Sequence, residues 1–174
     1  MNSNKGQVWV ETVIYTLIGL TIIGVLLTLV TPKINETRDK IVIEQSVEAL
    51  NFLDGKISEA RFVAGNTRQF SLTIKKGEMI FDGENDTVEF FIRGSKFVYS
   101  EPGVEITEGR VKVLTSEVVG RYDVSLKIDY SGSLNITYQG EDVVKTLQQA
   151  SVPYDLSLTN EGVANNRTEI SFSI

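Results

Sequence analysis

The side chains available for chemistry in this chain are carboxylates, hydroxyls and amines, because its 174 residues include no cysteine and no histidine. Thiol nucleophiles, Ser-His-Asp triads, disulfides and zinc sites with the usual ligands are therefore excluded. The densest acidic cluster runs from Asp82 to Asp86. It offers oxygen ligands for calcium but lacks the spacing of a helix-loop-helix calcium loop, so a solvated hairpin turn is the favoured interpretation.

The other carboxylates of the C-terminal half give no pairing that places two of them at the distance needed for acid-base catalysis. This applies to Asp123, Asp129, Glu141 and Asp142. The sequence therefore predicts no catalytic residue, no metal site and no cofactor, and we expect that the protein is not an enzyme.

One carboxylate, Glu11, has an unusual setting. It is the single charge in an apolar run from Val8 to Val30, whose 23 residues would form a helix about 34 Å long. Such a helix can cross the roughly 30 Å hydrocarbon core of a bilayer. A carboxylate deep in a membrane costs about 2.5–3.5 kcal/mol. Glu11 is therefore expected to have a partner.

The residues around Glu11, the string KGQVWVE from Lys5 to Glu11, stand directly against the apolar run. This segment resembles the class III signal peptide of archaeal type IV pilin-like proteins, a group that includes adhesive pilins and archaellins. The resemblance implies that a membrane-embedded aspartyl prepilin peptidase cleaves between Gly6 and Gln7, on the cytoplasmic side. Lys5, Gly6 and Gln7 are then the processing residues, residues 1–6 are the leader, and the mature chain begins at Gln7.

Cleavage before Gln7 would create an α-ammonium close to Glu11. Opposite unit charges about 4 Å apart attract by about 4 kcal/mol at an effective dielectric constant near 20. Gln7 and Glu11 are i,i+4 neighbours, but the frayed end of a helix can also reach a neighbouring subunit. We therefore expect Gln7 and Glu11 to act in assembly. The alternative is that Glu11 simply snorkels to the lipid headgroups.

The apolar run is too long for the 7–15-residue core of a cleaved secretory signal, and no Ala-x-Ala site follows it. A plain signal anchor is the second interpretation, with Met1 to Lys5 inside the cell and the chain after Pro32 outside. Pro32 is expected to close the span by kinking or breaking the helix. The membrane helix is accordingly placed at residues 7–31.

An amphipathic helix is predicted at residues 32–66. Ile43, Val47, Leu50 and Ile57 lie near helical spacing, with charged residues between them. Gly65 followed by Asn66 is a natural stop, because both residues tolerate the left-handed conformation that ends helices.

From residue 67 onward the apolar pattern alternates, and Gly-containing turns separate short runs. Strands are predicted near residues 69–75, 79–82, 87–92, 96–100, 110–115, 122–130, 133–138, 154–159 and 168–173. Residues 141–150 are expected to form a helical turn or a long loop. The predicted fold class is α+β: a long N-terminal hydrophobic helix, then an antiparallel β-sandwich or open barrel at residues 67–174.

The net charge of −6 and the scattered basic residues argue against a nucleic-acid partner. Four Asn-x-Thr sequons follow the apolar run, and they are possible N-glycosylation sites on an external domain. They begin at Asn35, Asn85, Asn135 and Asn166. Because strand propensity also favours Asn-Ile-Thr sequences, the motif alone does not establish a glycan.

The sequence thus favours a structural subunit, major or minor, of an archaeal type IV pilus-type surface filament. Its expected partners are a prepilin peptidase, copies of itself or other pilin-like subunits, and membrane lipid before assembly. It would cross the cell membrane once with a cytoplasmic N-terminus, and then join an extracellular filament. The alternative is a monomeric, signal-anchored membrane protein with an extracellular β-sandwich binding domain.

Overall fold

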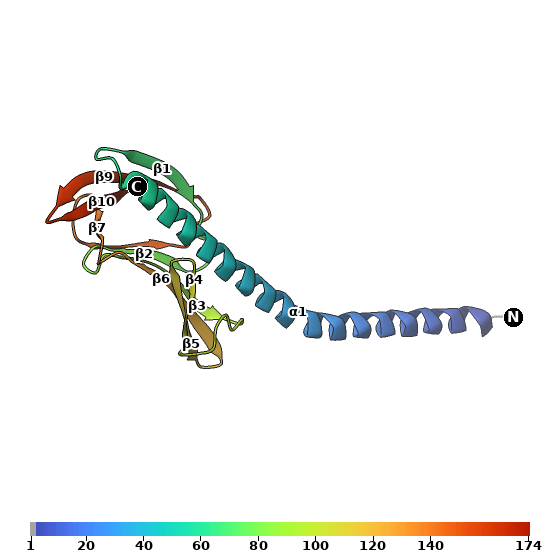
Figure 1. The fold of residues 1–174 in the computed structure, drawn as a ribbon. Coiled ribbons are helices and arrows are strands. Elements are labelled where there is room, and N and C mark those ends of the chain that lie inside the picture. The colour runs from blue at the N-terminus through green and yellow to red at the C-terminus, as the bar shows by residue number, and fades with distance from the viewer. Residues whose placement is uncertain (1–2) are drawn as a thin grey trace. The chain divides into compact units, whose positions relative to one another are not determined.

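The structure is a computed structural model that describes residues 3–174, with side chains described from Val8 onward (Figure 1). It contains one long helix, α1 (Ser3–Ala60), followed by a β-rich region. The chain forms two compact units, Met1–Arg38 and Asp39–Ile174. The predicted α+β class, a long apolar N-terminal helix followed by mostly antiparallel sheets, is confirmed.

The helix α1 continues through Pro32 and ends at Ala60. Of the two outcomes expected at Pro32, a kink or a break, the break is therefore wrong. A proline removes one backbone donor, but nearby Ser and Thr side chains and the remaining bonds can maintain a helix. Beside the proline, the Thr31 hydroxyl donates to the Leu27 carbonyl at 2.6 Å.

The helix also ends six residues before the predicted stop at residue 66. Beyond Ala60, Gly65 has a φ of 76° and its N–H donates to the carbonyl of Asn160 at 2.7 Å. The Asn160 side chain in turn donates to the carbonyl of Ala60 at 3.0 Å. A residue 100 positions away therefore fixes the helix end, and no local pattern could indicate it.

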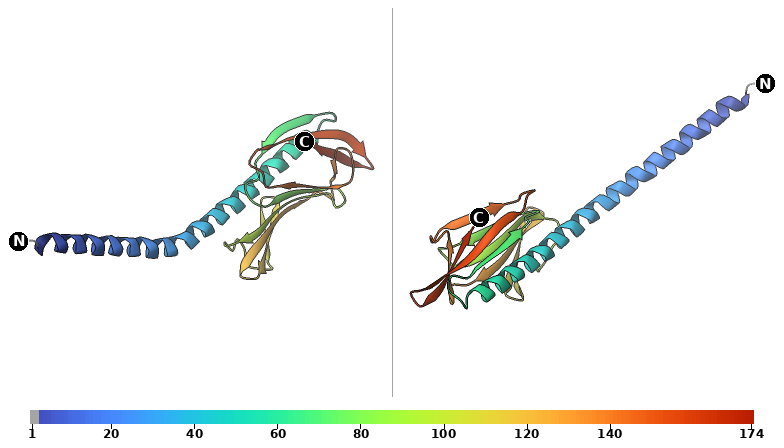
Figure 2. Two further views of the ribbon diagram at one scale, coloured as in Figure 1. Left: turned by 180° about the vertical axis from the view of Figure 1, so that it is seen from behind. Right: turned by 90° about the horizontal axis from the view of Figure 1, so that it is seen from above.

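Ten strands form two sheets in the second unit (Figures 1 and 2). Sheet A has the order β1-β9-β10-β7 and sheet B the order β4-β5-β6-β3-β2-β8. The neighbouring strands are antiparallel except β7 and β10, which are parallel. The bounds are β1 (Thr67–Leu72), β2 (Glu78–Asp82), β3 (Thr87–Ser95), β4 (Glu105–Glu108), β5 (Val111–Val118), β6 (Arg121–Asp129), β7 (Leu134–Tyr138), β8 (Val144–Gln148), β9 (Tyr154–Ala164) and β10 (Arg167–Ser173).

Three strand predictions differ from the structure. Residues 96–100 are irregular, and the Ser100 N–H donates to the Thr115 hydroxyl at 3.1 Å instead of joining a ladder. The short strand β4 was not predicted. Residues 144–148, expected in a helical turn or loop, form β8 and pair with β2.

The part of α1 from Asp39 onward belongs to the core of the second unit. Its apolar stripe is buried together with side chains of both sheets, and in Figure 1 this part of the helix lies beside β1 and sheet B. The buried helical residues are Ile43, Val47, Leu50, Leu53, Ile57 and Ala60. From Asp39 onward, the predicted amphipathic segment therefore packs on the β-domain.

Polar contacts also hold this part of α1 on the strands. The Asp39 carboxylate accepts from Lys76 Nζ at 2.5 Å and from the Lys96 N–H at 2.7 Å. Further along, Asp54 Oδ1 accepts from the Tyr130 hydroxyl at 2.9 Å and from Arg110 Nη1 at 3.2 Å. These bonds fix the position of the helix along the sheets.

Candidate functional site

The most unusual surface of α1 is formed by the side chains from Val8 to Val30. All large apolar residues of this segment are exposed, with exposed fractions from 37% for Val13 to 72% for Tyr15. The most apolar 18-residue stretch of this helix has a mean hydropathy of 2.5, with none of it buried. By length and composition, the helix is a candidate membrane anchor. So much apolar surface requires a cover of lipid or protein.

The threonines in this segment do not interrupt its apolar character. Each hydroxyl donates to the backbone carbonyl four residues earlier, at distances between 2.6 and 2.9 Å. Four of these residues, Thr12, Thr16, Thr21 and Thr28, lie within the segment, and Thr31 follows it directly. Because these donors are satisfied within the helix, they can enter an apolar environment at little cost.

Glu11 is exposed on this helix. Among the side chains that the structure describes, none forms an ion pair with it. The backbone of Lys5, Gly6 and Gln7 belongs to α1, but their side chains lie outside the described residues, as does the start of the predicted leader. A carboxylate on an otherwise apolar helix remains available for a partner.

The acidic cluster from Asp82 to Asp86 has a structural role. Asp82 accepts from the backbone N–H and the side-chain amide of Asn85, at 3.0 and 2.8 Å. Asp86 is buried, accepts from the Ile136 N–H at 2.8 Å and forms an ion pair with Arg167. The interpretation of the whole cluster as a solvated turn is therefore wrong for Asp86, which joins the β2–β3 turn to sheet A.

The remaining carboxylates weighed for catalysis do not converge. Asp123 accepts from the Gly94 N–H at 2.8 Å, and Asp142 accepts from the Asn135 amide at 3.3 Å. Asp129 accepts from the hydroxyl and N–H of Ser131, and these bonds lower the pKa of its carboxyl. Within the described residues, no group of three or more Asp or Glu side chains is arranged to hold a metal ion.

The four sequons differ in accessibility. Asn85 and Asn166 are exposed in turns, and Asn35 is half-buried on α1. Asn135 is half-buried in β7: its oxygen accepts from Arg167 Nη2 at 3.1 Å and its amide donates to Asp142. The hydroxyl-bearing residue of that last sequon, Thr137, is buried.

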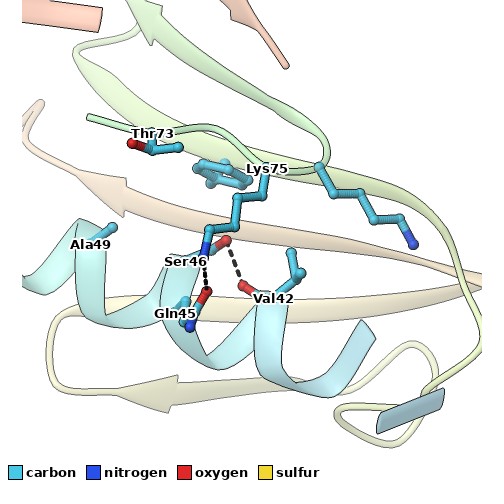
Figure 3. Close-up of a pocket in the computed structure, with 8 residues that line it drawn as sticks. Val42, Gln45, Ser46, Ala49, Thr73 and Lys75 are labelled. Carbon is cyan, nitrogen blue, oxygen red and sulfur yellow. Dashed lines mark hydrogen bonds between the residues drawn. The ribbon is translucent and has the colours of Figure 1, made fainter. Parts of the chain in front are cut away.

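Two hollows adjoin α1 in the second unit. One, of about 50 Å³, lies against the chain between β1 and β2, where Lys75 Nζ donates to Gln45 Oε1 at 3.4 Å (Figure 3). It has room for water molecules only. The other is a groove of about 370 Å³ between α1 and β1, floored by Leu53, Phe70 and Met79.

The groove combines residues of a helix and two strands, so sequence reasoning did not find it. A second feature that was not predicted is the exposed turn Val119–Gly120 between β5 and β6. The sequence did contain a signal for it, because a glycine between two predicted strands is typical of a turn.

The apolar helix with Glu11 is the strongest candidate site. Comparisons of the chain with family models, with curated proteins and with solved structures find no match.

Proposed function

We propose that this protein is a structural subunit of an archaeal type IV pilus-type surface filament. The chain is cleaved before Gln7 by a prepilin peptidase and assembles through its N-terminal helix. Before assembly the helix spans the cell membrane with its N-terminus in the cytoplasm. After assembly, the same helix lies among copies of itself or of other pilin-like subunits, and the β-unit is extracellular.

The observation that carries this proposal is the exposed apolar surface from Val8 to Val30, in which Glu11 is the only charged residue. A bilayer covers such a surface first. Other helices of the same kind can then replace the lipid, because helix packing in an apolar medium depends on close contact and polar pairing and not on expulsion of water. Gly19 and Gly24 have no side chain, and no other atom of the chain lies within 4 Å of the position that a Cβ would take on either one. A neighbouring helix can therefore come close to the backbone of α1 at these residues.

Glu11 supplies polar pairing in this proposal. The ammonium group created at Gln7 of one subunit faces the carboxylate of an incoming subunit, and their attraction fixes the axial register as the pair leaves water. The attraction between opposite charges is stronger where the dielectric constant is low. A packing that pairs the Glu11 carboxylate with the ammonium group is therefore more stable than one that leaves the carboxylate unpaired.

The deciding experiment is the N-terminal mass of the protein extracted from membranes. A terminus at Gln7 is expected. An intact Met1 would contradict processing and favour the alternative, a monomeric signal-anchored protein with an extracellular binding domain.

The role of Glu11 has its own test. Glu11→Gln keeps the size of the side chain and removes its charge, so filaments should become scarcer while the N-terminal mass stays unchanged. Glu36→Gln is the matched control, because Glu36 is also on α1 but already pairs with Lys33 at 2.8 Å. Filaments at normal abundance in the Glu11 variant would exclude the assembly role.

A further inference from the structure

The hairpin of β5 and β6 ends in an exposed apolar knob, defined here as Val118 and Val119. Val119 has an exposed fraction of 99% and a φ of 44°, and Gly120 follows with a φ of 72°. Two consecutive left-handed residues suit Asn or Gly, whereas a β-branched residue is strained there. The chain therefore presents a valine at a position where its own fold gives that side chain no contact and an unfavourable backbone conformation.

The groove between α1 and β1 has the complementary character. Its volume of about 370 Å³ lies in the lower part of the range of ligand pockets, about 300–1,000 Å³. Phe52 stands at its side with 54% of its surface exposed and its ring edge-on to Phe70, at 6.3 Å between centroids. The groove is also lined by Ala49, Leu53, Leu72 and Met79. Since β1 is an edge strand, the groove is open along one side.

One charge beside the knob is opposite in sign to one at the groove. Arg121 lies opposite Val118 in the β5–β6 ladder, and Glu48 lies at the groove. Both side chains are exposed, and in the part of the chain that the structure describes neither takes part in an ion pair. Arg121 could therefore pair with Glu48 of another molecule while the knob enters the groove.

We propose that the Val118–Val119 knob of one subunit docks in the α1–β1 groove of a second copy of this chain. The knob belongs to the β5–β6 hairpin, whereas the groove belongs to α1, β1 and Met79 of β2, so the two contacting surfaces differ. Such a head-to-tail contact repeats from copy to copy and generates a ring or a helical filament, not a closed pair. This inference rests on the proposed function, because it requires subunits that assemble.

Disulfide cross-linking tests the contact on a clean background, because the chain contains no cysteine. In the full-length protein, kept in its membranes and filaments, Ala49→Cys combined with Val119→Cys should give a ladder of oxidised species beyond the dimer. Either single variant should give no ladder. The matched control combines Ala49→Cys with Val152→Cys, since Val152 is 73% exposed but lies outside the knob.

A charge exchange tests the pairing separately in the same double-cysteine background. Glu48→Lys or Arg121→Glu alone should lower the cross-linking yield about two- to fivefold, as expected for an exposed ion pair. The two together should restore it. Restoration cannot result from a folding defect, because two such defects would add.

The outcomes separate this contact from the proposed function. Filaments whose subunits begin at Gln7 but give no ladder would overturn the contact and leave the function standing. The contact would also be overturned if Val119→Cys alone gave dimers in as high a yield as the double variant gives cross-linked species. Such dimers would indicate that two knobs meet in a symmetric contact. Absence of both ladder and filaments would contradict both proposals.

Discussion

Asp86 is a buried acidic residue on which the two sheets depend. Its φ of 54° places it in the left-handed region, and its carboxylate accepts the Ile136 N–H while pairing with Arg167. Asp86→Ala removes both contacts and leaves a buried N–H without an acceptor. We expect the free energy of unfolding to fall by about 2–3 kcal/mol, somewhat below the cost of breaking a fully buried pair because Arg167 is partly exposed.

Urea unfolding of the full-length protein in detergent measures this change. Glu84→Ala is the control, because Glu84 is an exposed residue of the same turn. Asp86→Asn should lie between the two, since asparagine tolerates the backbone conformation and can keep one hydrogen bond. An Asp86→Ala variant as stable as the Glu84→Ala control would contradict a structural role for the carboxylate.

Two tyrosines make the fold sensitive to alkaline conditions. Burial and the neighbouring Asp54 raise the pKa of Tyr130 well above its usual value of 10.0, and burial with the Glu108 hydrogen bond raises that of Tyr99 to about 12. Above pH 10 the unfolded chain loses these protons while the folded chain keeps them, so stability falls as pH rises. Thermal unfolding between pH 8 and pH 12 should show this loss, and Tyr130→Phe should reduce its slope. An unchanged slope in that variant would contradict the assignment to Tyr130.

The sequons give a prediction that depends on the external location of the β-unit. Asn166 lies exposed with a φ of 63° in the turn between β9 and β10, whereas the amide of Asn135 is bonded at both ends. Mass spectra of tryptic peptides from the native protein should show a glycan on Asn166 and none on Asn135. Asn166→Gly keeps the turn conformation and should remove that mass shift. A glycan found on Asn135 would contradict the structure of β7.

At the scale of elements, the residues of α1 from Asp39 to Ala60 behave as a core element of the β-unit. Leu50 is fully buried among strand residues, so Leu50→Ala should reduce the free energy of unfolding by about 2–5 kcal/mol through lost burial and a new cavity. Ile41→Ala, on an exposed face of the same helix, is the control. If both variants unfold at the same urea concentration, this part of α1 does not contribute to the core.

The sequence predicted those elements whose pattern is local. The apolar run and the positions of the long alternating strands follow from periodicity, and the start of the β-region near residue 67 follows from the change in period. The strand β8 was not predicted because it is an edge strand with a single buried residue, Leu147, and its sequence VKTLQ shows no regular alternation of apolar and polar residues. The end of α1 was not predicted correctly because Asn160, whose amide binds the carbonyl of Ala60, lies on β9.

Among the candidate sites too, features that depend on local sequence could be predicted, whereas features that depend on distant contacts could not. Glu11 could be singled out because a charge in an apolar run is visible in the sequence itself. The role of Asp86 could not, because its partner Arg167 lies 81 positions away on another sheet. The groove at Phe52 and Phe70 was also inaccessible to sequence reasoning, since it exists only after α1 packs beside β1.

At the scale of the whole molecule, the two compact units have different charge and apolar exposure. Of the 17 basic and 23 acidic residues, the first unit holds three and two, which leaves 14 and 21, a net charge of −7, for Asp39–Ile174. The exposed apolar stretch belongs to the first unit, whereas the second has its own core of helix and strands. The two units therefore need different surroundings. The apolar surface of the first unit must be covered by lipid or protein, whereas the second unit can remain in water.

This difference predicts the behaviour of a fragment that consists of residues 39–174. It should fold and remain a monomer in buffer without detergent, because the buried residues of α1 and the polar contacts of Asp39 and Asp54 are retained. Sedimentation velocity and circular dichroism check both points, with the full-length chain in detergent as the reference. The knob and groove are present in the fragment, but a contact of this size needs the helical polymer to hold subunits at high local concentration. Filaments formed by the fragment alone would therefore contradict assembly through the apolar helix, and an unfolded fragment would contradict the independence of the second unit.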